Sequence, residues 1–202
     1  MIRLLGRSGG EQGATILEFA LVLPFLLLLG LGTVEMGLGW VATDRAQTAT
    51  AQGARLAAVS GSRVESDRDI LLALQASLPA AQLGNLDRVV IFKPSSAQGA
   101  VPAGCVKTPG DTSQAGVSAS CNTYVGATVR SATATSMTQF GGGASALDRY
   151  WSPATRKDTL AGPPDYIGVW IRTTHENVTG SFFGDLTLTK VSIFRIQPDL
   201  EG

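Results

Sequence analysis

The side chains that could perform catalysis are sparse and match no known catalytic arrangement. His175 is the single histidine of the chain, and it stands beside Glu176 at the end of a predicted strand. No G-x-S-x-G frames a serine nucleophile, and no P-loop, H-E-x-x-H or strand-associated G-x-G-x-x-G occurs. The glycines at 141–143 follow no predicted strand and precede no lysine, so they predict a loop. We therefore expect a surface imidazole at position 175 and no enzymatic activity.

Cys105 and Cys121 are the two cysteines of the chain, and they bracket a segment rich in Gly and Ser. Two cysteines outside the cytoplasm pair by default. Closing a loop of about 15 residues stabilises a fold by roughly 3 kcal/mol in the chain-entropy treatment. A metal site is disfavoured, because there is no C-x-x-C spacing and a single histidine. We expect a disulfide, no metal and no cofactor.

The net charge and the distribution of hydrophobic residues disfavour a nucleic-acid-binding protein and favour a membrane protein. Sixteen basic and 16 acidic residues give a formal net charge of zero, and no Lys/Arg-rich run occurs, so nucleic-acid binding is not expected. Much of the hydrophobic content lies between Phe19 and Ala42, in the run FALVLPFLLLLGLGTVEMGLGWVA, whose single charge is Glu35. A helix that crosses a bilayer needs roughly 20 mainly apolar residues. The run therefore predicts a membrane-spanning helix.

Two other interpretations of this run are disfavoured. A buried helix of a soluble protein needs a polar face, whereas Leu and Phe occur here on all sides. A cleaved secretory signal could use Arg3 and Arg7 as its positive region and Ala49–Ala51 as its cleavage site. The run is longer than a usual signal core of about 7–15 residues, and Asp44 and Arg45 intervene before that site. We therefore expect an anchor that is retained.

The flanking charges predict the orientation of the anchor. Arg3 and Arg7 precede the apolar run, so the N-terminus should stay in the cytoplasm and the rest of the chain should be exported. Arg45 and Arg55 follow the run and act against this bias. We expect a single-pass protein of the bacterial inner membrane.

A stripe of small residues continues along the helix beyond the apolar run. Its members recur at spacings of four, three, four and four, so they share one helix face; they are Ala42, Ala46, Ala49, Gly53 and Ala57. Small stripes let helices approach closely. Two interpretations stay open: a packing face of Ala46, Ala49 and Gly53 for a helix of another subunit, or an accident of an Ala-rich composition.

The N-terminal stretch GATILEFALVLPFLLLLGLGTVEMG resembles TadE-like proteins, the pseudopilins of tight-adherence (Flp-type) pilus systems. Type IV prepilins share a short hydrophilic leader, a glycine, and a glutamate five residues into the mature helix. PDYIGVWIRTTHENVTGSFFG and LTLTKVSIFRIQP are similar to the closing strands of the family. The resemblance is strong from Gly13 to Arg55, moderate from Pro164 to Pro198, and absent between Ser95 and Leu160.

The resemblance implies a processing site and an assembly residue. Gly13 would end a leader that a prepilin peptidase removes, Ala14 would begin the mature chain, and Glu18 with Phe19 would form the family's Glu-Phe pair. An ionised carboxylate at the hydrocarbon edge costs at least a few kcal/mol unless it is paired. Cleavage would create an ammonium at Ala14, four residues from Glu18, and in the family this glutamate meets the terminal amine of a neighbouring subunit. The alternative is that Glu18 marks the water boundary.

Glu35 has a different expected role. It lies about 25 Å beyond Glu18 along a helix, and so near the far membrane interface. We expect its side chain to snorkel toward water there, rather than to meet a partner helix.

Beyond Ser60 the patterns predict an α+β domain. Gly61 should cap the long helix. One amphipathic helix is expected at Asp67–Leu78, and strands are expected at Arg88–Lys93, Tyr166–Thr174 and Leu186–Ile196. We expect a long N-terminal transmembrane helix that projects away from a small antiparallel sheet packed with one helix, in a pilin-like arrangement.

The expected organisation has three parts: a leader at 1–13, the transmembrane and extended helix at 14–60, and an extracytoplasmic domain at 61–202. Within that domain the region 95–164 is dominated by Gly, Ser, Ala, Thr and Pro, which predicts a loop-rich insertion with one short strand at Asn122–Val129. A mobile linker in part of it stays an open alternative.

These observations favour a pseudopilin, a minor subunit or assembly factor of a Flp/tight-adherence type IV pilus. Its expected partners are a prepilin peptidase, other pilin or pseudopilin subunits, pilus-assembly membrane proteins and the lipid bilayer. The competing class is a membrane-tethered envelope domain, unrelated to pili, that binds a ligand or carries an unrecognised activity.

Overall fold

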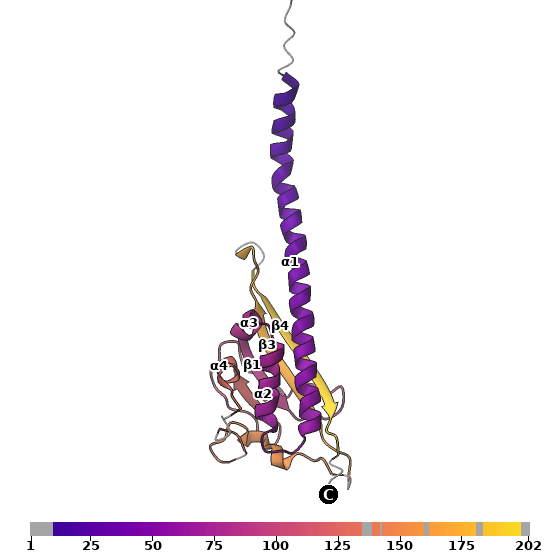
Figure 1. Ribbon diagram of the computed structural model, residues 1–202, viewed down its shortest axis with the longest axis vertical. Coiled ribbons are helices and arrows are strands. Elements are labelled where there is room, and N and C mark those ends of the chain that lie inside the picture. The colour runs from indigo at the N-terminus through magenta and orange to yellow at the C-terminus, as the bar shows by residue number, and fades with distance from the viewer. Residues whose placement is uncertain (1–9, 135–138, 142, 160–161, 181–183, 199–202) are drawn as a thin grey trace, which may run out of the picture.

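The computed structural model describes residues 10–134, 139–141, 143–159, 162–180 and 184–198. Residues 1–9 of the expected leader lie outside the described residues. The described chain forms one long helix and a four-stranded sheet with short helices, so the predicted α+β class is confirmed (Figure 1).

The long helix α1 runs over Gly10–Ser60 and contains 51 residues. Pro24 is its one proline, and leucine, which favours a helix, is the most frequent residue of its apolar half. The helix ends where the sequence predicts, because Gly61 adopts a left-handed backbone with φ 53° and donates its N–H to the Ala57 carbonyl at 3.1 Å.

Three short helices accompany α1. Helix α2 spans Ser66–Ser77 and buries Ile70, Leu71 and Leu74, so the predicted amphipathic helix is confirmed. Two further helices were not predicted, α3 at Ala80–Gly84 and α4 at Gly126–Ser131. They are too short to show a hydrophobic period.

The sheet is antiparallel throughout, in the order β2-β1-β3-β4. The three strands predicted with an apolar pattern are confirmed with ends shifted by up to two residues; they are β1 at Leu86–Phe92, β3 at Tyr166–His175 and β4 at Leu186–Arg195. The short fourth strand, β2, covers Cys121–Val125. It ends before the predicted Val129, because α4 begins at Gly126. A Cβ at Gly126 would lie 1.6 Å from the Leu86 carbonyl oxygen, so only glycine allows this turn.

Successive side chains of each strand point to opposite faces of the sheet, so the core is divided between the two faces. Val89, Ile91, Val169 and Ile171 pack toward α1 and α2 in the larger core cluster. Val90, Phe92 and Trp170 form the smaller cluster on the opposite face with Cys105 and Cys121. Each face therefore needs its own cover, helices on one side and the segment around the disulfide on the other.

The C-terminal half of α1 is part of this core, whereas the sequence predicted that the whole helix projects away. It packs against α2, β3 and β4 (Figure 1). Ala46 and Ala49 are fully buried, and a Cβ on Gly53 would lie 3.1 Å from Leu74 Cδ2 of α2. The predicted packing face thus exists in the structure, and it receives another helix. The chain's own second helix occupies it.

The loop-rich region is fixed to the sheet through several anchors. Cys105 and Cys121 form a disulfide with a Cα–Cα distance of 6.2 Å, which confirms the predicted pairing. Arg88 donates to the carbonyls of Asp111 and Ser113, and the second of these bonds is 2.7 Å long. Arg172 donates to the Lys107 carbonyl at 2.8 Å. The segment between β1 and β2 is therefore a covering layer of the domain.

Because Gly53 touches α2, Gly53→Leu should destabilise the domain itself. Overpacking of a tight contact costs about 1–3 kcal/mol, and we expect a fall of that size in the free energy of unfolding. Urea unfolding of the full-length chain in detergent micelles, followed by tryptophan fluorescence, measures it. Gln47→Ala is the matched control on the exposed face of the same helix, and it should change the value by less than about 0.5 kcal/mol. An unchanged stability of Gly53→Leu would refute the α1–α2 contact.

The disulfide should be present in protein extracted from the cell envelope. Peptide mapping without reductant should recover Cys105 joined to Cys121. Replacing both cysteines by serine should lower the free energy of unfolding by about 3 kcal/mol, since the bond closes a loop with a sequence separation of 16. Two free, alkylatable thiols in native protein would contradict the assignment.

Candidate functional site

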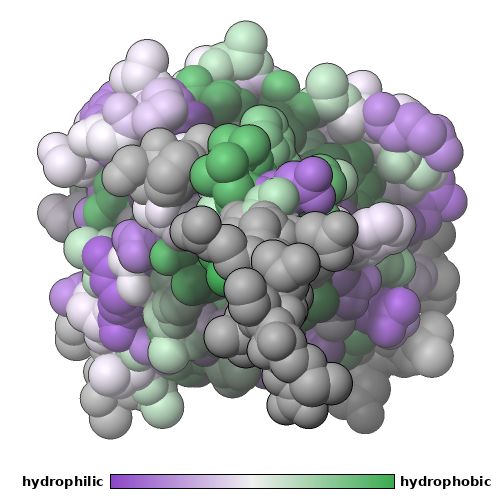
Figure 2. Space-filling model, turned by 90° about the horizontal axis from the view of Figure 1, so that it is seen from above, coloured by the Kyte–Doolittle hydropathy of each residue, from purple (hydrophilic) through white to green (hydrophobic). Residues whose placement is uncertain are grey.

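The N-terminal half of α1 presents an unpaired apolar surface. Side chains from Ala14 to Val34 are exposed around the helix, apart from the partly covered Gly32. This helix is the one in the described chain that is long and apolar enough to span a membrane. The view down α1 shows hydrophobic side chains gathered beside the helix axis and hydrophilic ones toward the rim (Figure 2). In water such a surface would be strongly unfavourable, so another apolar phase or helix must cover it.

The sequence-predicted processing and assembly residues lie at the start of this surface. Gly13 and Ala14 fall within the first turns of α1, since the helix begins at Gly10. Glu18 is exposed, and it is the one charged residue between Ala14 and Val34. Phe19 is exposed beside it. The helix therefore brings Ala14 and Glu18 to one face, four residues apart.

A cleft of about 780 Å³ lies where the bare half of α1 meets the domain. One wall is α1 itself, and the other is the connection between β3 and β4. The exposed surface of the lining is mostly apolar. The lining residues on α1 are Leu28, Leu29, Gly32, Thr33, Glu35, Met36, Gly39, Trp40 and Thr43, and those opposite are Asn177, Gly184, Asp185 and Leu186. Leu186 approaches α1 closely, because a Cβ on Gly39 would lie 3.5 Å from its Cδ2.

Glu35 lies in the wall of this cleft, and the expectation that it snorkels toward water is wrong. Its residue is 5% exposed, and its Oε1 accepts a hydrogen bond from the Thr179 backbone N–H. Its Oε2 is buried without a hydrogen-bond partner among the described residues. The loop after β3 folds over this carboxylate and removes it from water.

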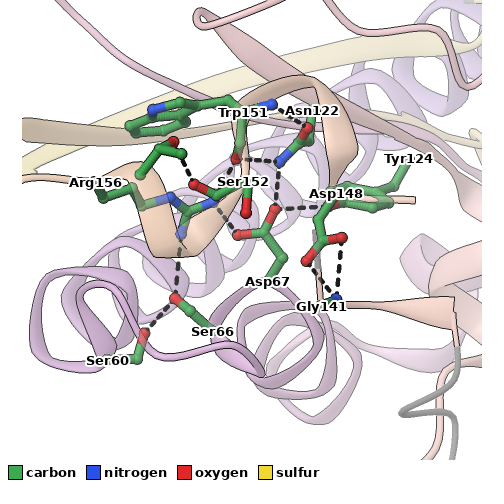
Figure 3. A network of polar contacts seen from close by, with 11 residues as sticks. Ser60, Ser66, Asp67, Asn122, Tyr124, Gly141, Asp148, Trp151, Ser152 and Arg156 are labelled. Carbon is green, nitrogen blue, oxygen red and sulfur yellow. Dashed lines mark hydrogen bonds and ion pairs between the residues drawn. The ribbon is translucent and has the colours of Figure 1, made fainter. Parts of the chain in front are cut away.

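A second polar cluster is enclosed in the domain at the N-terminal end of α2, where Ser66 and Asp67 are buried (Figure 3). The carboxylate of Asp67 forms an ion pair with Arg156, and both side chains are fully buried. Arg156 also donates to the Ser66 hydroxyl at 3.2 Å and lies 4.5 Å from the ring centre of Trp151. The Ser66 hydroxyl in turn contacts Ser60 at the end of α1.

The other oxygen of Asp67 is held by β2. Asn122 Nδ2 donates to it at 2.8 Å, and the Tyr124 hydroxyl donates to it at 2.6 Å. The Asn122 side chain also forms two hydrogen bonds with the Trp151 backbone: its Nδ2 donates to the Trp151 carbonyl at 2.8 Å, and its Oδ1 accepts from the Trp151 N–H at 2.9 Å. The carboxylate therefore joins α2, β2 and the 149–156 segment, which are distant in sequence.

This cluster is enclosed in the domain and holds its elements together. None of its groups lines the cleft, and burial together with the Asp67 charge holds the pKa of Tyr124 well above its ordinary value of 10.0. Sequence reasoning missed Asp67 and Arg156, because Asp67 reads as an ordinary acid in the first turn of a helix and Arg156 stands in a loop-rich region. No group of three His, Cys, Asp or Glu side chains in the described chain could hold a metal ion.

Tyr124→Phe should test this cluster. At pH 7 it removes a hydrogen bond to a buried carboxylate, and we expect a loss of about 1.5–3 kcal/mol in the free energy of unfolding. A phenol with a raised pKa binds its proton more tightly in the folded state, so its contribution persists below pH 10 and is lost as the pH rises above that value. The variant should therefore lose less stability than wild type above pH 10. Tyr150→Phe, whose hydroxyl meets Arg149 at the surface, is the control. Parallel pH curves for wild type and Tyr124→Phe would contradict the assignment.

Comparison with known protein families matches residues 13–55 to TadE-like proteins. The matched segment is about one fifth of the chain and contains Gly13, Ala14, Glu18, Phe19 and the stripe residues from Ala42 to Gly53. No curated protein and no solved structure matches the chain. The TadE-like match associates this protein with Tad/Flp pilus systems, and it confirms the resemblance seen from Gly13 to Arg55. Over residues 13–55, the N-terminal helix of the chain is thus similar to that of TadE-like proteins.

Proposed function

We propose that this chain is a pseudopilin, a minor subunit or assembly factor of a Flp-type pilus that a prepilin peptidase processes. The observation that carries the proposal is the divided helix α1. One half is bare and apolar, while the other half is built into the core of the domain. A single continuous helix thus connects the domain rigidly to an apolar rod.

Such a helix suits a subunit that exchanges a bilayer for a filament. Lipid tails cover the bare surface before assembly, and apolar helices of other subunits cover it afterwards, so little apolar surface meets water in either state. The domain need not refold in this exchange, because none of its core residues lies between Ala14 and Val34. The proposed location is the inner membrane, with the N-terminus in the cytoplasm and the domain outside.

Glu18 would fix the axial position of one subunit relative to its neighbour in the filament. At 1.5 Å per residue its carboxylate lies about 6 Å along the helix from Ala14. After cleavage, the Ala14 ammonium of a neighbouring subunit would pair with this carboxylate and offset the cost of a charge in the hydrocarbon edge. A subunit placed out of register would leave both charges unpaired.

Processing would require local unwinding. The bond between Gly13 and Ala14 lies in the first turns of α1, and a protease cleaves a chain that is extended in its active site. A glycine lowers the cost of leaving the helix by about 1 kcal/mol relative to alanine, and the end of a helix frays most easily. The peptidase would therefore act on an opened first turn.

The experiment compares processing with assembly. Mass spectrometry of the mature N-terminus should find Ala14. Gly13→Leu should leave a full-length precursor that is still anchored, because the apolar helix is unchanged. Glu18→Leu should be inserted at least as well as wild type but should abolish assembly, measured by crosslinking to other pilus subunits. Asp44→Asn, an exposed acid on the same helix, should behave as wild type. A mature chain that begins at Met1, or near Thr50, would refute the pseudopilin assignment.

A further inference from the structure

We propose that the cleft at Glu35 binds a phospholipid with a primary ammonium headgroup, such as phosphatidylethanolamine. The inference rests on the proposed function in one respect, the membrane span of α1. It goes beyond that function because it assigns a specific lipid site to the junction of helix and domain.

The depth of the cleft is the first argument. With Ala14 at the inner hydrocarbon edge, Glu35 lies about 31 Å further along the helix, close to the roughly 30 Å thickness of the hydrocarbon core. Trp40 follows about one and a half turns later and is 79% exposed in the cleft wall. Tryptophan is enriched at the level of the lipid headgroups. The cleft therefore opens at the outer interface, where a headgroup meets its acyl chains.

The polar atoms of this region are the second argument. Glu35 lines the cleft and is only 5% exposed, and its buried Oε2 has no hydrogen-bond partner among the described residues. A carboxylate oxygen left in this state is unfavourable by about 1–3 kcal/mol, and a bound ligand that donates a hydrogen bond to the carboxylate would remove the penalty.

The charge of the lining selects the headgroup. Its ionisable members are Glu35 and Asp185, and no Lys or Arg lines the cleft in the described chain. Two carboxylates attract a cation and repel an anionic headgroup. A primary ammonium can also donate a hydrogen bond to Glu35 Oε2, whereas the quaternary ammonium of a choline headgroup cannot.

Continuity of the apolar surface identifies a lipid as the occupant. The side chains that would contact the acyl chains of the lipid are Leu28, Leu29 and Met36. They belong to the same exposed, apolar helix surface that the bilayer covers. A lipid beside α1 therefore enters the cleft without crossing water, with its chains along these residues and its ammonium at Glu35. A second copy of the chain could fill the cleft in the same way only if it presented a cationic group at the depth of Glu35.

The test uses the full-length chain in nanodiscs with equal amounts of phosphatidylethanolamine, phosphatidylcholine and phosphatidylglycerol. Native mass spectrometry after transfer to mild detergent counts the lipids that remain bound. Wild type should retain about ten times as much phosphatidylethanolamine as phosphatidylcholine. Phosphatidylglycerol should be retained in the smallest amount. Glu35→Gln should reduce the first ratio to near one. Asp44→Asn, an exposed acid outside the cleft, should leave it unchanged.

Two further variants separate binding from folding. Asp185→Asn changes an exposed side chain and should lower the preference without loss of structure. Gly32→Phe fills the cleft and should abolish lipid retention. Equal retention of the three lipids by inserted wild-type protein, or a second copy of the chain bound in place of lipid, would overturn the inference and leave the proposed function intact. Failure of the chain to insert at all would overturn the membrane span and the lipid site together.

Discussion

The close contact between α1 and the rest of the domain is the interaction on which the structure depends. Helix α1 supplies a face of alanine and glycine, so α2 and the sheet can approach its backbone; at Gly53 the neighbouring Leu74 leaves no room for a large side chain. Because the same helix continues as a bare apolar rod, every contact on this face also fixes the direction in which the rod leaves the domain. The domain and this apolar rod therefore form one mechanical unit.

The buried Asp67–Arg156 pair fixes the part of the chain that has the least regular structure. Two charges without water are costly, and the pair is favourable only because the remaining hydrogen-bonding capacity of the carboxylate is taken up. Here Asn122 and Tyr124 bind the second oxygen, and Trp151 covers the guanidinium. Removing one partner would leave an uncompensated buried charge, so the 149–156 segment has one well-defined position over α2 and β2.

The connection between β3 and β4 performs a related task at the opposite end of the domain. It reaches along α1 and places Thr179 over Glu35. A carboxylate at the end of an apolar helix is thereby enclosed in a mostly apolar cleft while one of its oxygens stays unpaired. The junction between the apolar half of α1 and the domain is thus an ordered site with defined contacts.

The sequence by itself determined the features that depend on local pattern. The apolar run, the stop at Gly61, the period of α2, the apolar strands and the Gly-Ala-Glu spacing could all be read directly, because each is set by neighbours within a few turns. The disulfide also followed, since two cysteines have one pairing. Tertiary structure alone decided which surface covers the stripe of small residues. Small side chains allow another helix to pack closely, but they do not determine which helix it is. It also decided that Asp67 and Arg156 meet across 89 residues and that a distant loop buries Glu35. Charges of this kind look solvent-exposed in any local pattern, and only long-range packing removes them from water.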